Sequence, residues 1–208
     1  MRLAAAILAA WFGTVGSFAA WTAEIPQDAW QWRRTLTREA QSEWGLSAPI
    51  SDFGAQIEQE SAWRPNAKSR VGAYGLSQFM PATATWIAGA YPSLGPEPQP
   101  ANPVWAIRGL VVYDKHLWDR VRAVDDCNRM AKALSGYNGG ISWIYRDEIL
   151  AADKGLDPSR YFGNVETVNS GRSAANWKEN RGYPRRILVN LSPRYQRADW
   201  GATMCEDF

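Results

Sequence analysis

The chain has 208 residues, of which 46% are hydrophobic, and a formal net charge of +2. This length corresponds to one domain with at most a short appendage, and the hydrophobic content is sufficient for a core. A net charge this close to zero does not favour a nucleic-acid partner, because proteins that follow a phosphate backbone carry a concentrated basic stripe. We therefore expect one folded domain, a monomer that does not bind nucleic acid.

The N-terminal residues have the character of an export segment. Residues 3–23 follow Arg2, contain no charge and are rich in alanine. Residues 1–19 could form a signal peptide with a small-x-small cleavage site at Ser17-Phe18-Ala19. Alternatively, the uncharged run is a weak signal-anchor that associates transiently with the inner membrane. Both alternatives place residues 20–208 outside the cytoplasm, in the periplasm or cell envelope.

The chain contains two cysteines, Cys127 and Cys205. In an oxidising compartment an even pair is expected to form a disulfide, and two free thiols are the alternative. The single histidine, His116, and the absence of a Cys-x-x-Cys motif provide no metal-binding constellation. We expect neither a metal nor another cofactor.

Helix signals recur along the chain, and no segment alternates apolar and polar residues over a long stretch. Proline and glycine positions predict helices over residues 27–44, from 49 to the neighbourhood of 60, from 81, over 103–121 and over 125–135. Five prolines between residues 91 and 103 predict a surface loop. The expected fold class is mainly α, with at most a small β-hairpin near residues 71–79.

Glu60 occupies a position where the helical pattern calls for an apolar residue. Ile50, Phe53 and Ile57 recur at spacings of three and four, and Glu60 is the next residue on that stripe. One interpretation is that the helix is ending and Glu60 is solvated. The other is that Glu60 is poorly solvated, which raises the pKa of a carboxyl towards the range of a general acid.

A glycine-rich loop follows this helix and ends in an amide. Gly72 and Gly75 permit a tight turn, and Gln78 comes shortly before Pro81, which opens another helix. A carboxylic acid that faces such a loop is a candidate sugar-binding site.

Residues 60–84 resemble the catalytic domain of the soluble lytic transglycosylases, which are relatives of goose-type lysozymes. The shared pattern is Glu-Ser-Ala-Trp, then Lys-Ser-x-Val-Gly-Ala-x-Gly-Leu-x-Gln-x-Met-Pro-x-Thr-Ala. The resemblance implies a single lysozyme-like helical domain with Glu60 as the catalytic residue. Ser77 stands where the family commonly has Met, and we expect this change to loosen one sugar or peptide contact. The substrate-binding residues that the resemblance implies in this stretch are Ser61, Ser69, Gly75, Ser77, Gln78 and Met80.

Two later motifs follow in the order of the family. The run Gly136-Tyr137-Asn138-Gly139 by itself predicts a turn after a helix, whereas the resemblance places Tyr137 and Asn138 in the sugar cleft. The run from Glu179 to Tyr183 resembles a helix whose Tyr hydroxyl bonds the catalytic carboxyl, with Glu179 as a candidate supporting group. Pro184 stands where the family usually has Val, so we expect a helix that starts at Tyr183.

Seven basic residues gather in the last part of the chain, and we expect most of them to form a solvated face. The alternative is that they help to hold anionic peptidoglycan or a membrane surface. They are Arg172, Lys178, Arg181, Arg185, Arg186, Arg194 and Arg197.

One carboxyl must serve as both acid and base if the neighbouring carboxylates point elsewhere. Asp52 is about two turns down the helix from Glu60, and Glu58 is roughly 200° around it.

The resemblance implies cleavage of the MurNAc-β-1,4-GlcNAc bond of peptidoglycan with formation of 1,6-anhydroMurNAc ends. A hydrolytic muramidase, such as a phage endolysin or a goose-type lysozyme, is the first alternative. A binding module with a degenerate site is the second, and the intact Glu60, Gln78, Tyr137 and Tyr183 argue against it.

Overall fold

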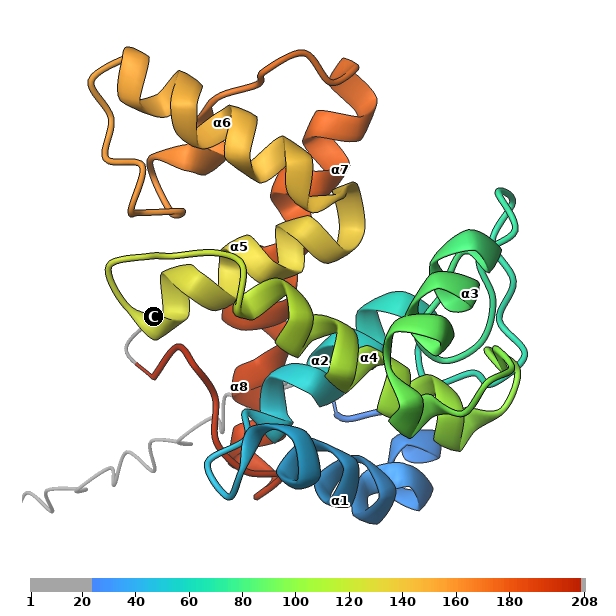
Figure 1. Ribbon diagram of the computed structural model, residues 1–208. Coiled ribbons are helices and arrows are strands. Elements are labelled where there is room, and N and C mark those ends of the chain that lie inside the picture. The colour runs from blue at the N-terminus through green and yellow to red at the C-terminus, as the bar shows by residue number, and fades with distance from the viewer. Residues whose placement is uncertain (1–23, 207–208) are drawn as a thin grey trace, which may run out of the picture.

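Helices make up nearly all of the regular structure in the computed structural model, which describes residues 24–206 (Figure 1). The predicted export segment therefore lies outside the described residues. No helix within residues 24–206 is long and apolar enough to cross a membrane. The elements are η1 (Gln27–Trp32), α1 (Arg33–Trp44), α2 (Ile50–Ser61), α3 (Pro81–Ala90), η2 (Pro92–Leu94), α4 (Pro103–Trp118), α5 (Asp126–Gly139), α6 (Ile141–Asp153), η3 (Val165–Thr167), α7 (Ala174–Arg185), η4 (Arg186–Leu191) and α8 (Ser192–Arg197).

The predicted fold class is confirmed. Two isolated antiparallel bridges, Lys68 with Tyr74 and Tyr74 with Phe79, stand where a small hairpin was expected, and no strand forms among the described residues. The helix starts follow local chemistry: Pro81 occupies the first turn of α3, and Asn102 caps α4 by accepting from the backbone N–H of Val104 at 3.0 Å. Helix α4 ends at Trp118, slightly earlier than expected.

Two apolar clusters divide the domain. The larger one is formed by α1, α2, α4, α5 and the helices near the C-terminus. The smaller one lies beneath α3 and includes Phe79, Ile87 and Trp105. Tyr113 and Tyr137 pack against both clusters, so the two rings lie at the junction between them. In Figure 1, α3 and its neighbouring loops stand apart from α5, α6 and α7.

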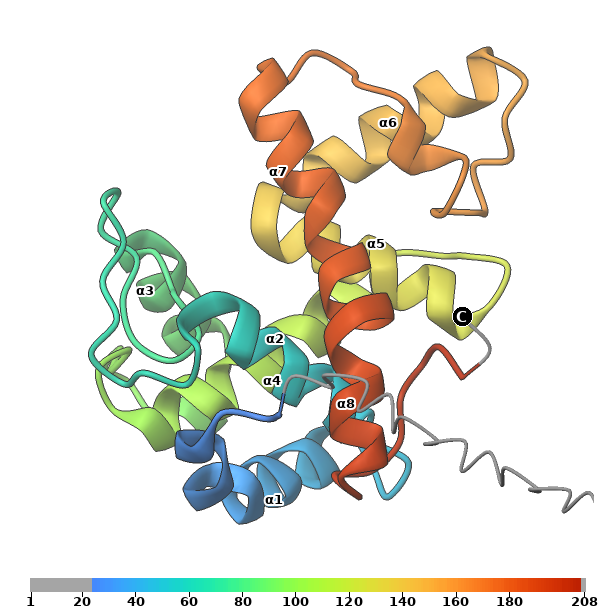
Figure 2. The same cartoon turned by 180° about the vertical axis from the view of Figure 1, so that it is seen from behind.

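The last helices form one long rod, and this corrects the expectation for Pro184. Helix α7 runs from Ala174 through Pro184 and continues as the π-helix η4 and then α8 (Figure 2). Pro184 has no N–H to donate within the helix, which removes one backbone hydrogen bond. Tyr183, Ile187 and Leu188 are buried around it. Tertiary packing of these apolar groups outweighs the local helix-breaking tendency.

Helix α5 is also longer than expected. It extends to Gly139, so Tyr137 and Asn138 lie in its last turn and not in a turn after it. The residue after the helix is Gly140, which adopts a φ of +93° that favours glycine.

The basic cluster is only partly solvated. Arg172 and Arg181 are buried and pair with the fully buried Asp147, with Arg172 Nη2 at 2.5 Å from Asp147 Oδ2. Arg194 is partly buried and pairs with Glu58 at 3.0 Å. The prediction of a solvated face is wrong for these three residues, because each has a carboxylate partner inside the fold.

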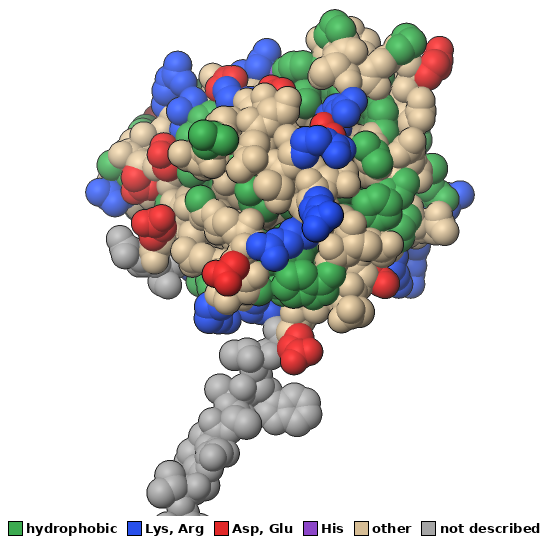
Figure 3. Space-filling model, turned by 90° about the horizontal axis from the view of Figure 1, so that it is seen from below, with side chains coloured by type: hydrophobic (Ala, Val, Ile, Leu, Met, Phe, Trp, Pro, Cys, Tyr) green, Lys and Arg blue, Asp and Glu red, His purple; other side chains and the backbone are tan. Residues whose placement is uncertain are grey.

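The C-terminal tail is tied to the rest of the domain. Cys127 and Cys205 form the predicted disulfide, with their Cα atoms 4.7 Å apart. Beside the bridge, Thr203 and Met204 hydrogen-bond the fully buried Asp52 of α2. The face of the molecule in Figure 3 shows basic and acidic side chains interspersed with apolar ones.

Candidate active site

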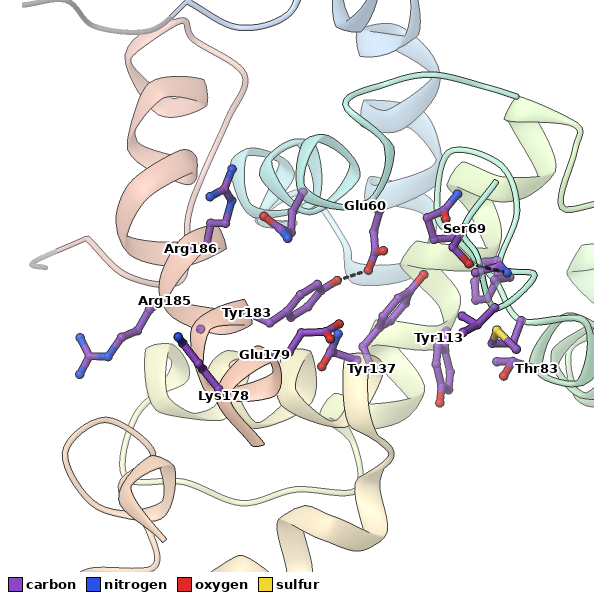
Figure 4. Close-up of a pocket in the computed structure, with 18 of the residues that line it drawn as sticks. Glu60, Ser69, Thr83, Tyr113, Tyr137, Lys178, Glu179, Tyr183, Arg185 and Arg186 are labelled. Carbon is purple, nitrogen blue, oxygen red and sulfur yellow. Dashed lines mark hydrogen bonds between the residues drawn. The ribbon is translucent and has the colours of Figure 1, made fainter. Parts of the chain in front are cut away.

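A cleft with a volume of about 1030 Å³ separates the end of α2 and the start of α3 from α7 (Figure 4). Segments distant in sequence form its walls. The lining residues are Gln59, Glu60, Ser69, Val71, Ala73, Gln78, Phe79, Met80, Thr83, Tyr113, Tyr137, Asn138, Ala175, Lys178, Glu179, Gly182, Tyr183, Arg185, Arg186 and Asn190.

Glu60 lies in this cleft because of the stripe it shares with the core. Ile50, Phe53 and Ile57 are buried on α2, and Glu60 is the next residue on that face. The helix stops immediately afterwards, since Ala62 and Trp63 have φ angles of 50° and 61°. Trp63 is fully buried and donates its indole N–H to Tyr195 Oη at 2.7 Å. This anchor fixes the end of α2 and with it the position of Glu60.

The Glu60 carboxyl has an unusual protonation equilibrium. Burial raises its pKa to about 7, a hydrogen bond from Tyr183 opposes this rise, and the charge of Glu179 adds to it. A pKa near neutrality means that both the acid and the carboxylate are well populated at physiological pH. Such a group can donate a proton in one step and accept one in the next.

Tyr183 contacts Glu60 directly. Its hydroxyl donates to Glu60 Oε1, as Figure 4 shows. The residue is 4% exposed, so the ring has little freedom to turn away. Because α7 runs through Pro184, Tyr183 is held within a continuous helix opposite the end of α2. The contact spans 123 positions of sequence.

Tyr137 and Asn138 reach the cleft from the end of α5. The Tyr137 hydroxyl donates to the backbone carbonyl of Ser77 at 2.8 Å. The centroids of the Tyr137 and Tyr113 rings are 5.2 Å apart. Asn138 Oδ1 accepts from Asn180 Nδ2 of α7 at 3.1 Å. These bonds join α5 both to the glycine-rich loop and to α7.

The glycine-rich loop presents two polar side chains to the cleft. Ser69 Oγ accepts from the backbone N–H of Ala73 at 2.9 Å. Gln78 Nε2 donates to the carbonyls of Ala67 at 3.0 Å and Gly75 at 2.9 Å, so both amide hydrogens are used. The Gln78 side-chain oxygen can accept a further hydrogen bond. Met80 also lines the cleft and is 41% exposed.

Three residues predicted to bind substrate lie behind the cleft wall. Ser61 is 2% exposed, and its hydroxyl donates to the Ile57 carbonyl within α2. Ser77 is fully buried and donates to the Ala106 carbonyl at 2.8 Å, which binds the loop to α4. A Cβ on Gly75 would lie 1.9 Å from the Pro100 carbonyl oxygen, so this glycine permits a close backbone approach. None of the three is among the residues that line the cleft, and their contacts support its wall.

The two other carboxylates of α2 have partners away from the cleft. Asp52 accepts from Ser192, Thr203 and Met204, and Glu58 pairs with Arg194 and Tyr195. Glu179 is the one further carboxylate that lines the cleft among the described residues.

Part of the basic cluster lies at the edge of the cleft and forms a basic rim. Lys178 lies beside Glu179, and Arg186 lies on the other side of Tyr183 (Figure 4). Arg185 also lines the cleft, and its side chain points away from Glu60 and pairs with Glu166 at 2.5 Å. The sequence pattern grouped these residues and left open whether they face solvent or hold anionic peptidoglycan. No group of three or more His, Cys, Asp or Glu residues within residues 24–206 is arranged to hold a metal ion.

A mainly helical domain with one perturbed carboxyl in a large cleft agrees with the lysozyme-like class. The profile of the transglycosylase SLT domain family matches residues 39–155, more than half of the chain. The chain belongs to the transglycosylase SLT domain family.

Particular relatives support the same assignment. Membrane-bound lytic murein transglycosylase F of Shewanella halifaxensis is 33% identical over 135 residues, which cover 64% of this chain and 27% of the relative. A solved structure of the lytic transglycosylase Slt from Pseudomonas aeruginosa, an inactive glutamate-to-glutamine mutant, is 26% identical with a TM-score of 0.56, covering 83% of this chain and 25% of that one. The 70 kDa soluble lytic transglycosylase of Escherichia coli shares the fold at 23% identity with a TM-score of 0.57, covering 83% of this chain and 25% of that one. The chain thus spans about a quarter of the length of these relatives.

Proposed function

We propose that this chain is a peptidoglycan lytic transglycosylase that cleaves the MurNAc-β-1,4-GlcNAc bond and leaves 1,6-anhydroMurNAc ends. The observation that carries the proposal is Glu60, a carboxyl with a pKa near 7 that Tyr183 orients at the base of the cleft. The cleft volume of about 1030 Å³ is at the upper end of ordinary ligand pockets, roughly 300–1,000 Å³.

In the first step Glu60 acts as the general acid. Its proton passes to the bridging O4 oxygen of GlcNAc as the bond from that oxygen to C1 of MurNAc breaks, leaving positive charge on the MurNAc ring. Glu179 supplies a negative charge in the same cleft that stabilises this oxocarbenium-like ring.

In the second step the Glu60 carboxylate is the general base. It takes the proton of the MurNAc 6-hydroxyl as O6 forms a bond to C1, which closes the 1,6-anhydro ring and restores the acid. The Tyr183 hydrogen bond favours the carboxylate over the acid and so supports this half of the cycle. No water enters the product, and no second carboxyl is needed to activate one.

The basic rim fits an anionic substrate. Lys178 and Arg186 lie along the cleft wall formed by α7 and η4. Carboxylates attached to the glycan strand are the groups that these side chains would attract.

A hydrolytic muramidase is the second candidate, and Glu179 is the observation that favours it, since this carboxylate lines the same cleft as Glu60. Mass spectrometry of products from purified peptidoglycan separates the two. The anhydro product retains the mass of the uncleaved disaccharide unit, whereas the hydrolytic product is heavier by one water. Hydrolytic ends as the main product would overturn the transglycosylase proposal, and Glu60→Gln provides the inactive control.

We also propose export to the periplasm or cell envelope. The support is the uncharged segment of residues 3–23 together with a substrate that lies outside the cytoplasm. Intact-mass measurement after expression in a Gram-negative host distinguishes the two forms of export. Loss of residues 1–19 indicates a cleaved signal peptide, and full-length protein in the membrane fraction indicates a signal-anchor.

A further inference from the structure

A buried polar contact lies one turn before the catalytic carboxyl. Gln56 precedes Glu60 by four residues and therefore lies on the same face of α2. Its Nε2 donates to Asp114 Oδ1 of α4 at 3.3 Å. Both side chains are fully buried. The contact joins α2, which carries Glu60, to α4.

Each partner of this contact also has one polar atom without a partner. Gln56 Oε1 and Asp114 Oδ2 are buried and make no hydrogen bond. No basic side chain forms a salt bridge with Asp114 within residues 24–206. An ionised carboxylate offers acceptors alone, so it cannot satisfy the amide oxygen. A protonated carboxyl offers one donor and one acceptor, which complement the acceptor and donor of an amide.

We propose that Asp114 carries a proton in the working enzyme and forms an acid–amide pair with Gln56, which positions Glu60. In this pair Asp114 Oδ2 donates to Gln56 Oε1, and Gln56 Nε2 donates to Asp114 Oδ1. One proton thereby satisfies both of the unpartnered oxygens. Asp114 is a positioning residue, and this role rests on the proposed function because it is defined relative to Glu60 as the acid.

The surroundings of Asp114 favour its neutral form. Burial is the largest cause that raises its pKa well above the ordinary value, the hydrogen bond from Gln56 opposes the rise, and the charges of Glu60 and Asp52 add to it. None of the facing titratable groups is a base. They are Glu60 and Asp52 on α2, Tyr137 on α5, Tyr183 on α7 and, on α4 itself, Tyr113.

A neutral Asp114 matters for the second half of the reaction. An anion at this position would repel the Glu60 carboxylate and raise the pKa of Glu60 further. Glu60 would then remain protonated and could not accept the proton of the 6-hydroxyl. The acid–amide pair holds α2 against α4 without placing a charge beneath the catalytic group.

The test compares Asp114→Asn with Asp114→Leu. An Asn amide can form the same two hydrogen bonds with Gln56 without a titrating proton. We expect Asp114→Asn to retain kcat/KM on purified peptidoglycan within about twofold and to leave the pH midpoint assigned to Glu60 unchanged. Asp114→Leu leaves Gln56 unpaired, and we expect kcat/KM to fall by roughly tenfold or more. Rescue by the amide but not by Leu is the pattern that supports the pair.

Infrared spectroscopy provides a readout that does not depend on activity. The difference spectrum between wild type and Asp114→Asn at pH 7 should contain the C=O stretch of a protonated carboxyl. Carboxylate bands in its place would overturn the proposal. A Glu60 midpoint that falls by about one pH unit in Asp114→Asn, or failure of that variant to fold, would also overturn it. If peptidoglycan is not the substrate, the infrared result still decides the state of Asp114.

Discussion

Replacing Glu60 by Gln should abolish activity and stabilise the protein in a strongly pH-dependent manner. The amide has nearly the volume of the carboxyl, and its oxygen can still accept from Tyr183. It cannot donate the proton needed for bond cleavage. Loss of clearing of purified peptidoglycan is therefore expected to accompany an intact fold.

The size of the stabilisation follows from the Glu60 pKa. Burial raises that pKa from an ordinary 4.5 to about 7. Below pH 4.5 the wild-type carboxyl is neutral in both the folded and the unfolded chain, so the substitution changes little. As the pH rises towards 7, the unfolded chain ionises first, and the wild type loses up to ~3 kcal/mol relative to the variant. For a domain of this size that difference corresponds to a rise in melting temperature of roughly 5–10 °C.

The assay measures the melting temperature of both proteins at a series of pH values from 4 to 9. The difference between the two curves isolates Glu60, because the buried Asp52, whose pKa is raised to about 6, titrates in both proteins. The difference should be near zero at pH 4 and reach a plateau above pH 7. A difference in melting temperature that is the same at every pH would refute the argument that Glu60 is buried with a raised pKa. Residual clearing activity above a few per cent would refute its role as the acid.

Three further outcomes are expected. Tyr183→Phe removes a hydrogen bond that lowers the pKa of Glu60, so the alkaline limb of the pH–rate profile should move up by about one pH unit while the maximal rate falls roughly tenfold. Tyr137→Phe is the control, since its hydroxyl bonds the Ser77 carbonyl, and a limb that moves equally in both variants would contradict the assignment. Periplasmically produced protein should show no free thiol until a reductant opens the bridge between Cys127 and Cys205, so thiol labelling without reductant would argue against it. Gly75→Ala should lower the free energy of unfolding by ~2 kcal/mol or more in chemical denaturation, because the φ of Gly75 is +81° and the new Cβ would meet the Pro100 carbonyl. An unchanged denaturation midpoint would show that the loop accommodates the methyl group without strain.

Local signals predicted much of the helical framework. Pro81, Asn102 and Gly45 mark helix boundaries by chemistry that acts within one turn, and the structure places boundaries at all three. The apolar stripe on α2 also placed Glu60 in line with the core residues, but it left open whether the carboxyl is solvated. The contact between Glu60 and Tyr183 was predicted from the resemblance to a family, because no local rule relates residues 123 positions apart.

Features decided by tertiary packing could not be predicted. Pro184 is a helix breaker by local chemistry, yet buried neighbours on both sides carry the helix through it. Arg172 and Arg181 have the composition of a solvated face, and their partner Asp147 lies on another helix, more than twenty positions earlier. Ser77 is a polar residue in a loop, and its burial depends on a carbonyl of α4.

The hydrogen bonds to Asp52 have a consequence for the order in which this chain folds. The groups that satisfy Asp52 come from Ser192 and from Thr203, which are 140 and 151 positions later in the chain. A nascent chain that ends after α6 therefore contains Asp52 without the groups that hydrogen-bond its carboxylate. We therefore expect α2 to reach the position seen here only after residues 192–204 have packed against it.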